Sequence, residues 1–171
     1  MYEYLGFFEG RLCFLNGEIP VVINPWLILL SGSASDEKVC GRPLGMILDA
    51  DNKDQLYVVD SSLGLLKVNT LNGSVEILSS ISDENKHLLN DIIALPNGSL
   101  IITDTSTKFS RYNNRMEAFE CRANGELLMY NPEEGSMHVI LRNLFFPNGL
   151  CLSHDGQTIL LVETTRARIL R

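Results

Sequence analysis

Six polar side chains sit at matching places in three copies of one short sequence pattern. Each copy is an apolar strand, a polar turn and a β-branched strand that ends in an acid. The acids are Asp60, Asp104 and Glu163, and the turns that lead into the first strands carry Asn90, Asp91 and Asn148. Carboxylate and amide oxygens in such turns either line a polar pocket or cap the turn by accepting hydrogen bonds from backbone amides. For Asp104 we favour turn capping.

The strands around these residues predict a β-propeller. The first strands begin near Leu44, Asn90 and Asn148, and the second strands cover residues 56–60, 100–104 and 160–163. Their spacing is close to the roughly 40–50 residues of one propeller blade. In an up-and-down blade the second strand returns to the end at which the first begins. We therefore predict an all-β fold whose polar residues gather at one end of a central channel.

The chain is too short to close a propeller. It has 171 residues, enough for three to four blades of roughly 45 residues, whereas closure takes about four to eight. We expect an incomplete arc. Residues 1–38 would form part of an outer hairpin, turning at residues 16–17, and an atypical connection, and residues 39–171 would form the blades. The uncovered faces and edges of an open arc favour aggregation.

Asn-Gly pairs predict several of the turns. The pairs at 72–73, 97–98 and 124–125 are expected to join neighbouring strands, because Asn-Gly tolerates the positive φ angles of tight hairpin turns. A polar insertion, residues 105–123, separates the second and third strands of the middle blade. We expect it at the same end as Asn90, as a pocket lid or as a disordered loop. No segment shows convincing helical periodicity.

Charge and residue usage exclude several kinds of function. The net charge is −7, which argues against a nucleic-acid surface. The three histidines lack metal-ligand spacing and the four cysteines contain no Cys-x-x-Cys, so a zinc site is not expected. The cysteines are either reduced thiols or form one or two disulfides. The longest apolar run, residues 19–30, is interrupted by Asn24-Pro25 and is shorter than the roughly 20 residues that span a bilayer.

Three longer stretches match one family in order and in register. They are Cys40-Gly41-Arg42-Pro43-Leu44-Gly45, Leu89-Asn90-Asp91 with Thr103-Asp104-Thr105, and Phe146-Pro147-Asn148-Gly149-Leu150. Together they resemble the strictosidine synthase-like family, and most of all its animal branch, the adipocyte plasma membrane-associated proteins. The resemblance implies a six-bladed propeller related to the paraoxonases. Relatives pair the cysteine matching Cys40 with an earlier one that is missing here, so Cys40 is free or has another partner.

The resemblance also implies a metal. In paraoxonase-like relatives, asparagines matching Asn90 and Asn148 offer side-chain oxygens to a calcium ion, which takes about six to eight such ligands. The alternative is that each asparagine caps its own turn. Asp91 would either hold the ligands in place or cap backbone amides, and Asp60, Asp104 and Glu163 would line the pocket or cap turns. Other ligands would come from outside this chain.

The family activities give three hypotheses. The intact parent would be a calcium-dependent hydrolase of aryl esters or lactones; otherwise it would be a non-catalytic, membrane-tethered scaffold, or an enzyme that condenses an amine with an aldehyde. The fragment alone would be inactive, and no catalytic residue is assigned. The resemblance places the propeller on the extracytoplasmic side, attached through a segment outside this chain. Asn72 and Asn97 begin Asn-Gly-Ser sequons and are candidate glycosylation sites.

Overall fold

The computed structural model describes Glu37, residues 41–80 and residues 87–171. The expected hairpin around residues 16–17, the atypical connection and Cys40 lie outside the described residues.

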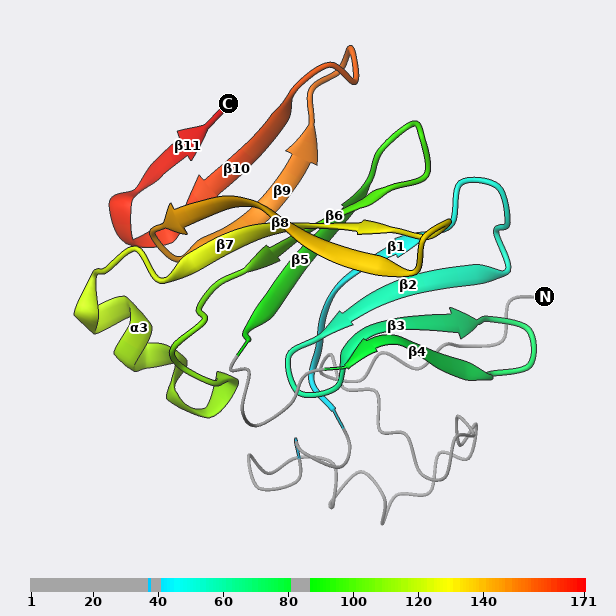
Figure 1. Ribbon diagram of the computed structural model, residues 1–171, viewed down its shortest axis with the longest axis horizontal. Helices are drawn as coiled ribbons and strands as arrows, with labels where there is room; N and C mark the ends of the chain where they lie inside the picture. The colour runs from blue at the N-terminus through cyan, green and yellow to red at the C-terminus, as the bar shows by residue number, and fades with distance from the viewer. Residues whose placement is uncertain (1–36, 38–40, 81–86) are drawn as a thin grey trace, which may run out of the picture.

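The described chain forms three antiparallel sheets that follow one another along the sequence (Figure 1). Blade 1 contains β1 (Pro43–Leu48), β2 (Gln55–Asp60), β3 (Gly64–Asn69) and β4 (Val75–Ser80). Blade 2 contains β5 (Leu89–Ala94), β6 (Leu100–Asp104), β7 (Gly125–Asn131) and β8 (Ser136–Leu144). Blade 3 contains β9 (Pro147–Leu152), β10 (Ile159–Glu163) and β11 (Arg168–Leu170). In each blade successive strands are neighbours, which is the up-and-down order predicted for a propeller.

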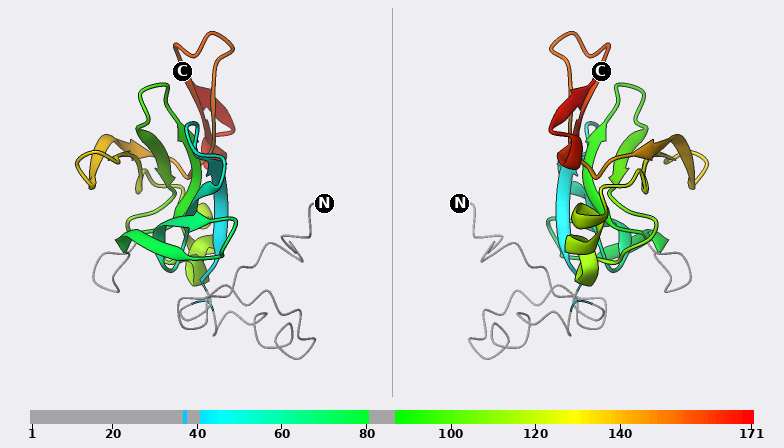
Figure 2. Two further views of the ribbon diagram at one scale, coloured as in Figure 1. Left: turned by 90° about the vertical axis from the view of Figure 1, so that its right-hand side faces the viewer. Right: turned by 90° about the vertical axis from the view of Figure 1, so that its left-hand side faces the viewer.

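The blades pack through apolar side chains on their facing surfaces. Between blades 1 and 2 the core includes Tyr57, Val59, Ile92 and Ile102. Between blades 2 and 3 it includes Ile93, Ile101, Leu127, Leu144 and Leu161. Because side chains alternate across a strand, β5 and β6 supply residues to both cores. Blade 2 is therefore sandwiched between its neighbours, and the first strands β1, β5 and β9 lie side by side (Figures 1 and 2).

Each first strand begins with the same irregularity. Pro43 pairs with Asp60, Leu89 with Asp104 and Pro147 with Glu163, and the register shifts directly after each pair. Two residues of the first strand then face one residue of the second, which is the arrangement of a β-bulge. The bulged pairs are Leu44-Gly45, Asn90-Asp91 and Asn148-Gly149. The predicted shared end of turns and acids is confirmed, and the bulge was not foreseen.

The turns depart from the sequence prediction in two ways. Gly73 and Gly98 have φ angles of 75° and 82°, while no positive φ occurs at Asn72 or Asn97. Both primed two-residue turns need positive φ at the first of their two central positions, which the asparagines do not provide, so these loops instead use only the glycine's left-handed conformation. The pair at 124–125 is not a hairpin turn, because it ends the insertion and Gly125 begins β7.

The insertion of blade 2 contains helical structure that the sequence analysis missed. A 3₁₀ turn, η1 (Arg111–Asn113), runs directly into the helix α3 (Asn114–Glu120). At seven residues α3 is too short to show a clear 3.6-residue repeat. It projects from the end of the blade at which β6 stops and β7 starts (Figure 1).

Candidate functional site

The two asparagines predicted as metal ligands occupy equivalent bulges in neighbouring blades, and each is held in the same way. Asn90 Nδ2 donates to Thr105 Oγ1 at 3.0 Å. Asn148 Nδ2 donates to Thr164 Oγ1 at 3.2 Å. Thr105 and Thr164 each follow the acid that ends the second strand. Both asparagines are partly buried, and neither Oδ1 accepts a hydrogen bond from a described residue. The arrangement presents two amide oxygens.

Asp91 joins blade 2 to blade 3. Its Oδ2 accepts a hydrogen bond from the backbone amide of Leu150 at 2.7 Å, and its Oδ1 accepts one from Ile92 at 2.9 Å. These contacts match the hypothesis that Asp91 caps backbone amides. Because Leu150 lies two residues after Asn148, Asp91 also fixes the backbone beside one candidate ligand.

Two of the acids that end second strands, Asp104 and Glu163, accept hydrogen bonds from backbone amides of the adjacent turns. Asp104 Oδ1 accepts hydrogen bonds from the amides of Leu88 at 2.8 Å and Ser106 at 3.3 Å. Glu163 Oε1 accepts one from Phe145 at 2.7 Å, and its other oxygen pairs with Arg168. Both carboxylates are fully buried, and these bonds are the capping role that we favoured for Asp104.

Asp60 caps the turn of blade 1 in a less complete way. Its Oδ1 accepts from the amides of Ser62 at 2.8 Å and Leu63 at 2.9 Å, but within the described residues its buried Oδ2 has no partner. Burial raises the pKa of Asp60, and the hydrogen bonds from backbone amides oppose that rise. Gly41, with φ 74°, passes beside this carboxylate, where a Cβ would lie 2.4 Å from Oδ2.

A histidine that the sequence analysis did not select lies at this end of blade 2. His87 Nδ1 is bonded to Asp104 Oδ2, and the pKa of His87 is raised by that bond and by the charges of Asp104 and Glu126, against the opposing effect of burial. The two residues lie seventeen positions apart in the sequence, so no short motif could have predicted the pair.

The insertion lies at the predicted end and is anchored by a buried glutamate. Glu117 of α3 is fully buried; it accepts a hydrogen bond from Ser106 Oγ and others from Asn124 Nδ2 at 3.2 and 3.3 Å. The insertion starts at Thr105, the residue that holds Asn90 and donates to the carbonyl of Pro147 at 2.7 Å. It is therefore tied to the strands that carry both asparagines.

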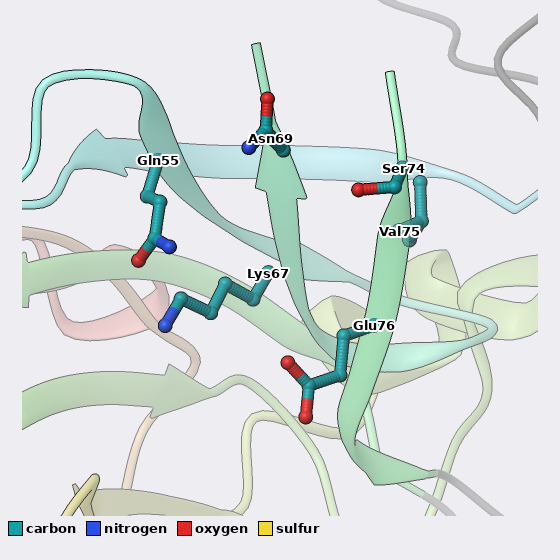
Figure 3. Close-up of a pocket in the computed structure, with 6 residues that line it drawn as sticks. All are labelled: Gln55, Lys67, Asn69, Ser74, Val75 and Glu76. Atoms are coloured by element: carbon teal, nitrogen blue, oxygen red, sulfur yellow. The ribbon is translucent and has the colours of Figure 1, made fainter. Parts of the chain in front are cut away.

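Two hollows lie beside the described strands, and Asn90 and Asn148 line neither of them. One is polar and opens at the far end of blade 1, lined by Gln55, Lys67, Asn69, Ser74, Val75 and Glu76 (Figure 3). The other lies on the outer face of blade 3, lined by Val162, Glu163, Thr164, Ala167, Arg168 and Ile169. The first hollow lies where β2 and β4 start and β3 ends, opposite to the end where β2 terminates in Asp60.

A serine–histidine contact occurs at that far end as well. Ser136 Oγ lies 2.9 Å from His138 Nε2. Glu134 approaches the same ring nitrogen at 3.8 Å, whereas a catalytic triad places the acid on Nδ1. His138 and Glu134 are exposed and Ser136 is partly buried, so the group is a surface cluster rather than an active site.

The remaining predicted residues are at the surface. Asn72 and Asn97 are exposed in the β3–β4 and β5–β6 turns, at the end opposite to Asn90, and their glycosylation stays a prediction. Cys121 and Cys151 are exposed free cysteines. In the described part of the chain, no helix is long and apolar enough to cross a membrane. Nor do three or more His, Cys, Asp or Glu side chains of that part cluster in a way that would hold a metal.

Comparison of the sequence with known proteins relates the chain to one protein family. The family profile described as strictosidine synthase matches residues 90–171, the part that holds both asparagines. Protein strictosidine synthase-like 13 from Arabidopsis thaliana is 38% identical over 137 residues, covering 79% of this chain and 34% of that protein. Adipocyte plasma membrane-associated proteins from Danio rerio and Homo sapiens are 33% and 36% identical, each covering 98% of this chain and 41% of the relative. The chain thus matches the strictosidine synthase family over residues 90–171 and is similar to its relatives over almost all of its own length.

The chain spans about two fifths of the length of the adipocyte plasma membrane-associated proteins that it matches. Solved structures confirm the propeller fold. A calcium-binding protein, regucalcin, from Agrobacterium tumefaciens aligns with a TM-score of 0.57 at 18% identity over 75% of this chain and 39% of its own. A putative gluconolactonase aligns with a TM-score of 0.57 at 17% identity over 75% and 44%. At such identities the likeness concerns the fold alone.

Proposed function

We propose that this chain contributes two ligands of a calcium site to a propeller hydrolase that acts on aryl esters or lactones. One observation carries the proposal: in two adjacent blades the same bulge position holds an asparagine whose Nδ2 donates to a threonine and whose Oδ1 accepts no hydrogen bond from the described residues. Neutral oxygen donors of this kind fit a hard cation such as Ca²⁺. They fit as part of a set, because two oxygens are fewer than the six to eight that the ion takes.

The names of the structural neighbours are consistent with this chemistry. One is described as a calcium-binding regucalcin and one as a putative gluconolactonase, so propellers of this shape include proteins with both attributes. When bound, a calcium ion would polarise the substrate carbonyl and stabilise the oxyanion. The residues of this chain would hold and orient it: Asn90 and Asn148 through their side-chain oxygens, and Asp91 through the backbone beside Asn148.

The test is hydrolysis by a complete propeller, made by joining this chain to the remaining blades of a relative. Phenyl acetate and a γ-lactone are the substrates, measured with and without a chelator. We expect chelation to abolish turnover and Asn90→Ala or Asn148→Ala to lower it by at least about tenfold, since ligand loss weakens metal binding. Asn97→Ala, at the opposite end of blade 2, is the matched control.

A non-catalytic scaffold is the second candidate, favoured by the relatives named adipocyte plasma membrane-associated protein. For that role the propeller would bind a partner at a membrane. A complete propeller that binds Ca²⁺ but hydrolyses neither substrate class would support the scaffold and contradict the hydrolase. Turnover that persists with both asparagines replaced would contradict the calcium site.

A further inference from the structure

We infer that Thr103, Thr105 and Thr164 are positioning residues that aim the Asn90 and Asn148 side-chain oxygens and fix their relative placement. The inference rests on the proposed calcium site, and it concerns three threonines for which neither the family resemblance nor the sequence pattern gave a role. Thr103 and Thr105 lie at the end of β6, and Thr164 directly follows β10.

The hydrogen bonding of Thr105 determines which way the Asn90 amide faces. A threonine hydroxyl has one proton to donate. Thr105 Oγ1 lies 2.7 Å from the carbonyl oxygen of Pro147, and a carbonyl oxygen only accepts, so the proton is used there. The contact of Oγ1 with the Asn90 side chain, at 3.0 Å, must then be donated by Asn90 Nδ2. The amide cannot flip without losing this bond, and Oδ1 is left as the group that faces away.

Thr103 uses its hydroxyl in the same way, with the backbone of Asn148 as the acceptor. Its Oγ1 donates to the carbonyl oxygen of Asn148 at 2.8 Å and accepts from the amide of Asp91 at 2.9 Å. Thr103 and Thr105 are fully buried. Each contacts blade 2 and blade 3 at once: Thr105 holds the Asn90 side chain and the carbonyl of Pro147, and Thr103 holds the backbone of Asp91 and Asn148. Thr103 and Thr105 therefore form a threonine clamp at the end of β6, which fixes the positions of the two asparagines relative to each other.

Thr164 repeats the arrangement one blade further on. It stands in the same place after Glu163 as Thr105 does after Asp104, and it accepts from Asn148 Nδ2 at 3.2 Å. Blade 1 provides the contrast. There the bulge carries Leu44 instead of an asparagine, and the equivalent hydroxyl of Ser61 donates to the carbonyl of its own blade's Arg42 at 3.3 Å. The hydroxyl that follows the strand-end acid therefore contacts a side-chain amide in blades 2 and 3, where the bulge carries an asparagine, and a backbone carbonyl in blade 1.

The experiment uses side-chain amide NMR on the 171-residue chain, because it reports the hydrogen bonds without metal and the binding with it. Thr164 is exposed, so Thr164→Val can remove the hydroxyl with little effect on folding. We expect the Asn148 Nδ2 protons to lose hydrogen-exchange protection in Thr164→Val and to keep it in Thr164→Ser. Ca²⁺ titration should show weaker binding by about tenfold in Thr164→Val, the size typical of residues that orient metal ligands.

Two further variants separate positioning from general stability. Thr105→Ser keeps the hydroxyl and should keep the affinity for Ca²⁺. Thr107→Val removes a hydroxyl that donates to the Asn124 carbonyl at 2.9 Å in the same insertion but touches neither asparagine, and it should also keep the affinity. If Ca²⁺ binds the unaltered chain and Thr164→Val with equal affinity, the positioning role is wrong. If Ca²⁺ moves neither asparagine amide in the unaltered chain, the calcium proposal itself is wrong.

Discussion

A buried acid at the end of the second strand accepts hydrogen bonds from backbone amides in each blade, but its other partners differ from blade to blade. Asp104 and Glu163 each accept a hydrogen bond from a backbone amide that precedes the first strand of their blade. Asp104 is also paired with His87, and Glu163 with Arg168. Among the described residues, Asp60 accepts hydrogen bonds from backbone amides only. A buried carboxylate that loses such donors is costly, since its desolvation is no longer compensated. These acids therefore hold the end of each blade together, and the asparagines next to them are available for other chemistry.

The His87–Asp104 pair predicts a pH-dependent stability. The pKa of His87 is raised in the folded protein, so its contribution is fully present below the unfolded pKa of about 6.5. It is lost as pH rises through the folded pKa. We expect the Tm to fall by a few degrees between pH 6 and pH 9. Glu126, which forms an ion pair with Arg142, is the other acid that acts on His87. Thermal melts across this range are the measurement.

The matched variants are His87→Gln and His154→Gln. His87→Gln should flatten the dependence of Tm on pH, while the replacement of His154, which is exposed, should leave the dependence unchanged. An unaltered slope in His87→Gln would show that another group governs stability in this range.

At the scale of single elements, the insertion of blade 2 depends on one side chain. Glu117 receives the Ser106 hydroxyl and the Asn124 amide in a fully buried position. Glu117→Ala would leave the Ser106 hydroxyl without its acceptor and Asn124 Nδ2 with Glu120 as its remaining described acceptor, at a cost of roughly 1–3 kcal/mol. We expect the loss to appear locally, as faster tryptic cleavage after Arg111 and Arg115, with a smaller change in global Tm. Glu133→Ala, on the exposed β7–β8 turn, is the control and should not alter cleavage.

The first strands β1 and β5 approach so closely that only glycine fits at position 45. A Cβ at Gly45 would lie 2.7 Å from Asp91 Cα and 2.9 Å from the Asn90 carbonyl oxygen. We predict that Gly45→Ala destabilises the chain by about 1–3 kcal/mol, the usual cost of overpacking. Gly149 holds the equivalent bulge position in blade 3, where a Cβ would have 3.9 Å to its nearest neighbour. Gly149→Ala should be neutral or slightly stabilising.

Denaturant unfolding of both variants measures this difference directly. Equal midpoints for Gly45→Ala and Gly149→Ala would show that blades 1 and 2 separate easily, contrary to the close contact of their first strands.

The strands were predictable because each blade is encoded locally. Alternating apolar residues and acids at strand ends place the first and second strands of each blade within a residue or two of their observed bounds. The short helix α3 escaped detection because Glu117 stabilises it from within the fold, and seven residues carry too weak a periodicity. The threonine clamp escaped for a related reason. Thr105 contacts Pro147 across 42 residues of sequence, and such a bond is visible only once neighbouring blades are placed side by side.

At the scale of the whole molecule, blade 3 differs from blade 2 in packing against another described blade on one side only. Its outer face exposes Val162 and Ile169, at 38% and 67% of their surface. These residues border the hollow that also includes Thr164, so the orienting contact to Asn148 is open to water. Water competes for a cation and weakens electrostatic contacts through its high dielectric constant.

The 171-residue chain should therefore bind Ca²⁺ weakly, show no aryl-ester turnover and self-associate. Binding is expected to be weak because two amide oxygens are a small part of the ion's usual coordination. Self-association is expected because an exposed apolar sheet face and strand edge offer a pairing surface. Calorimetric Ca²⁺ titration, phenyl acetate hydrolysis and sedimentation velocity are the measurements. Ile169→Glu should reduce association, whereas Leu71→Glu, on an exposed turn of blade 1, should not. Micromolar binding together with chelator-sensitive turnover would show instead that three blades suffice to form a working site.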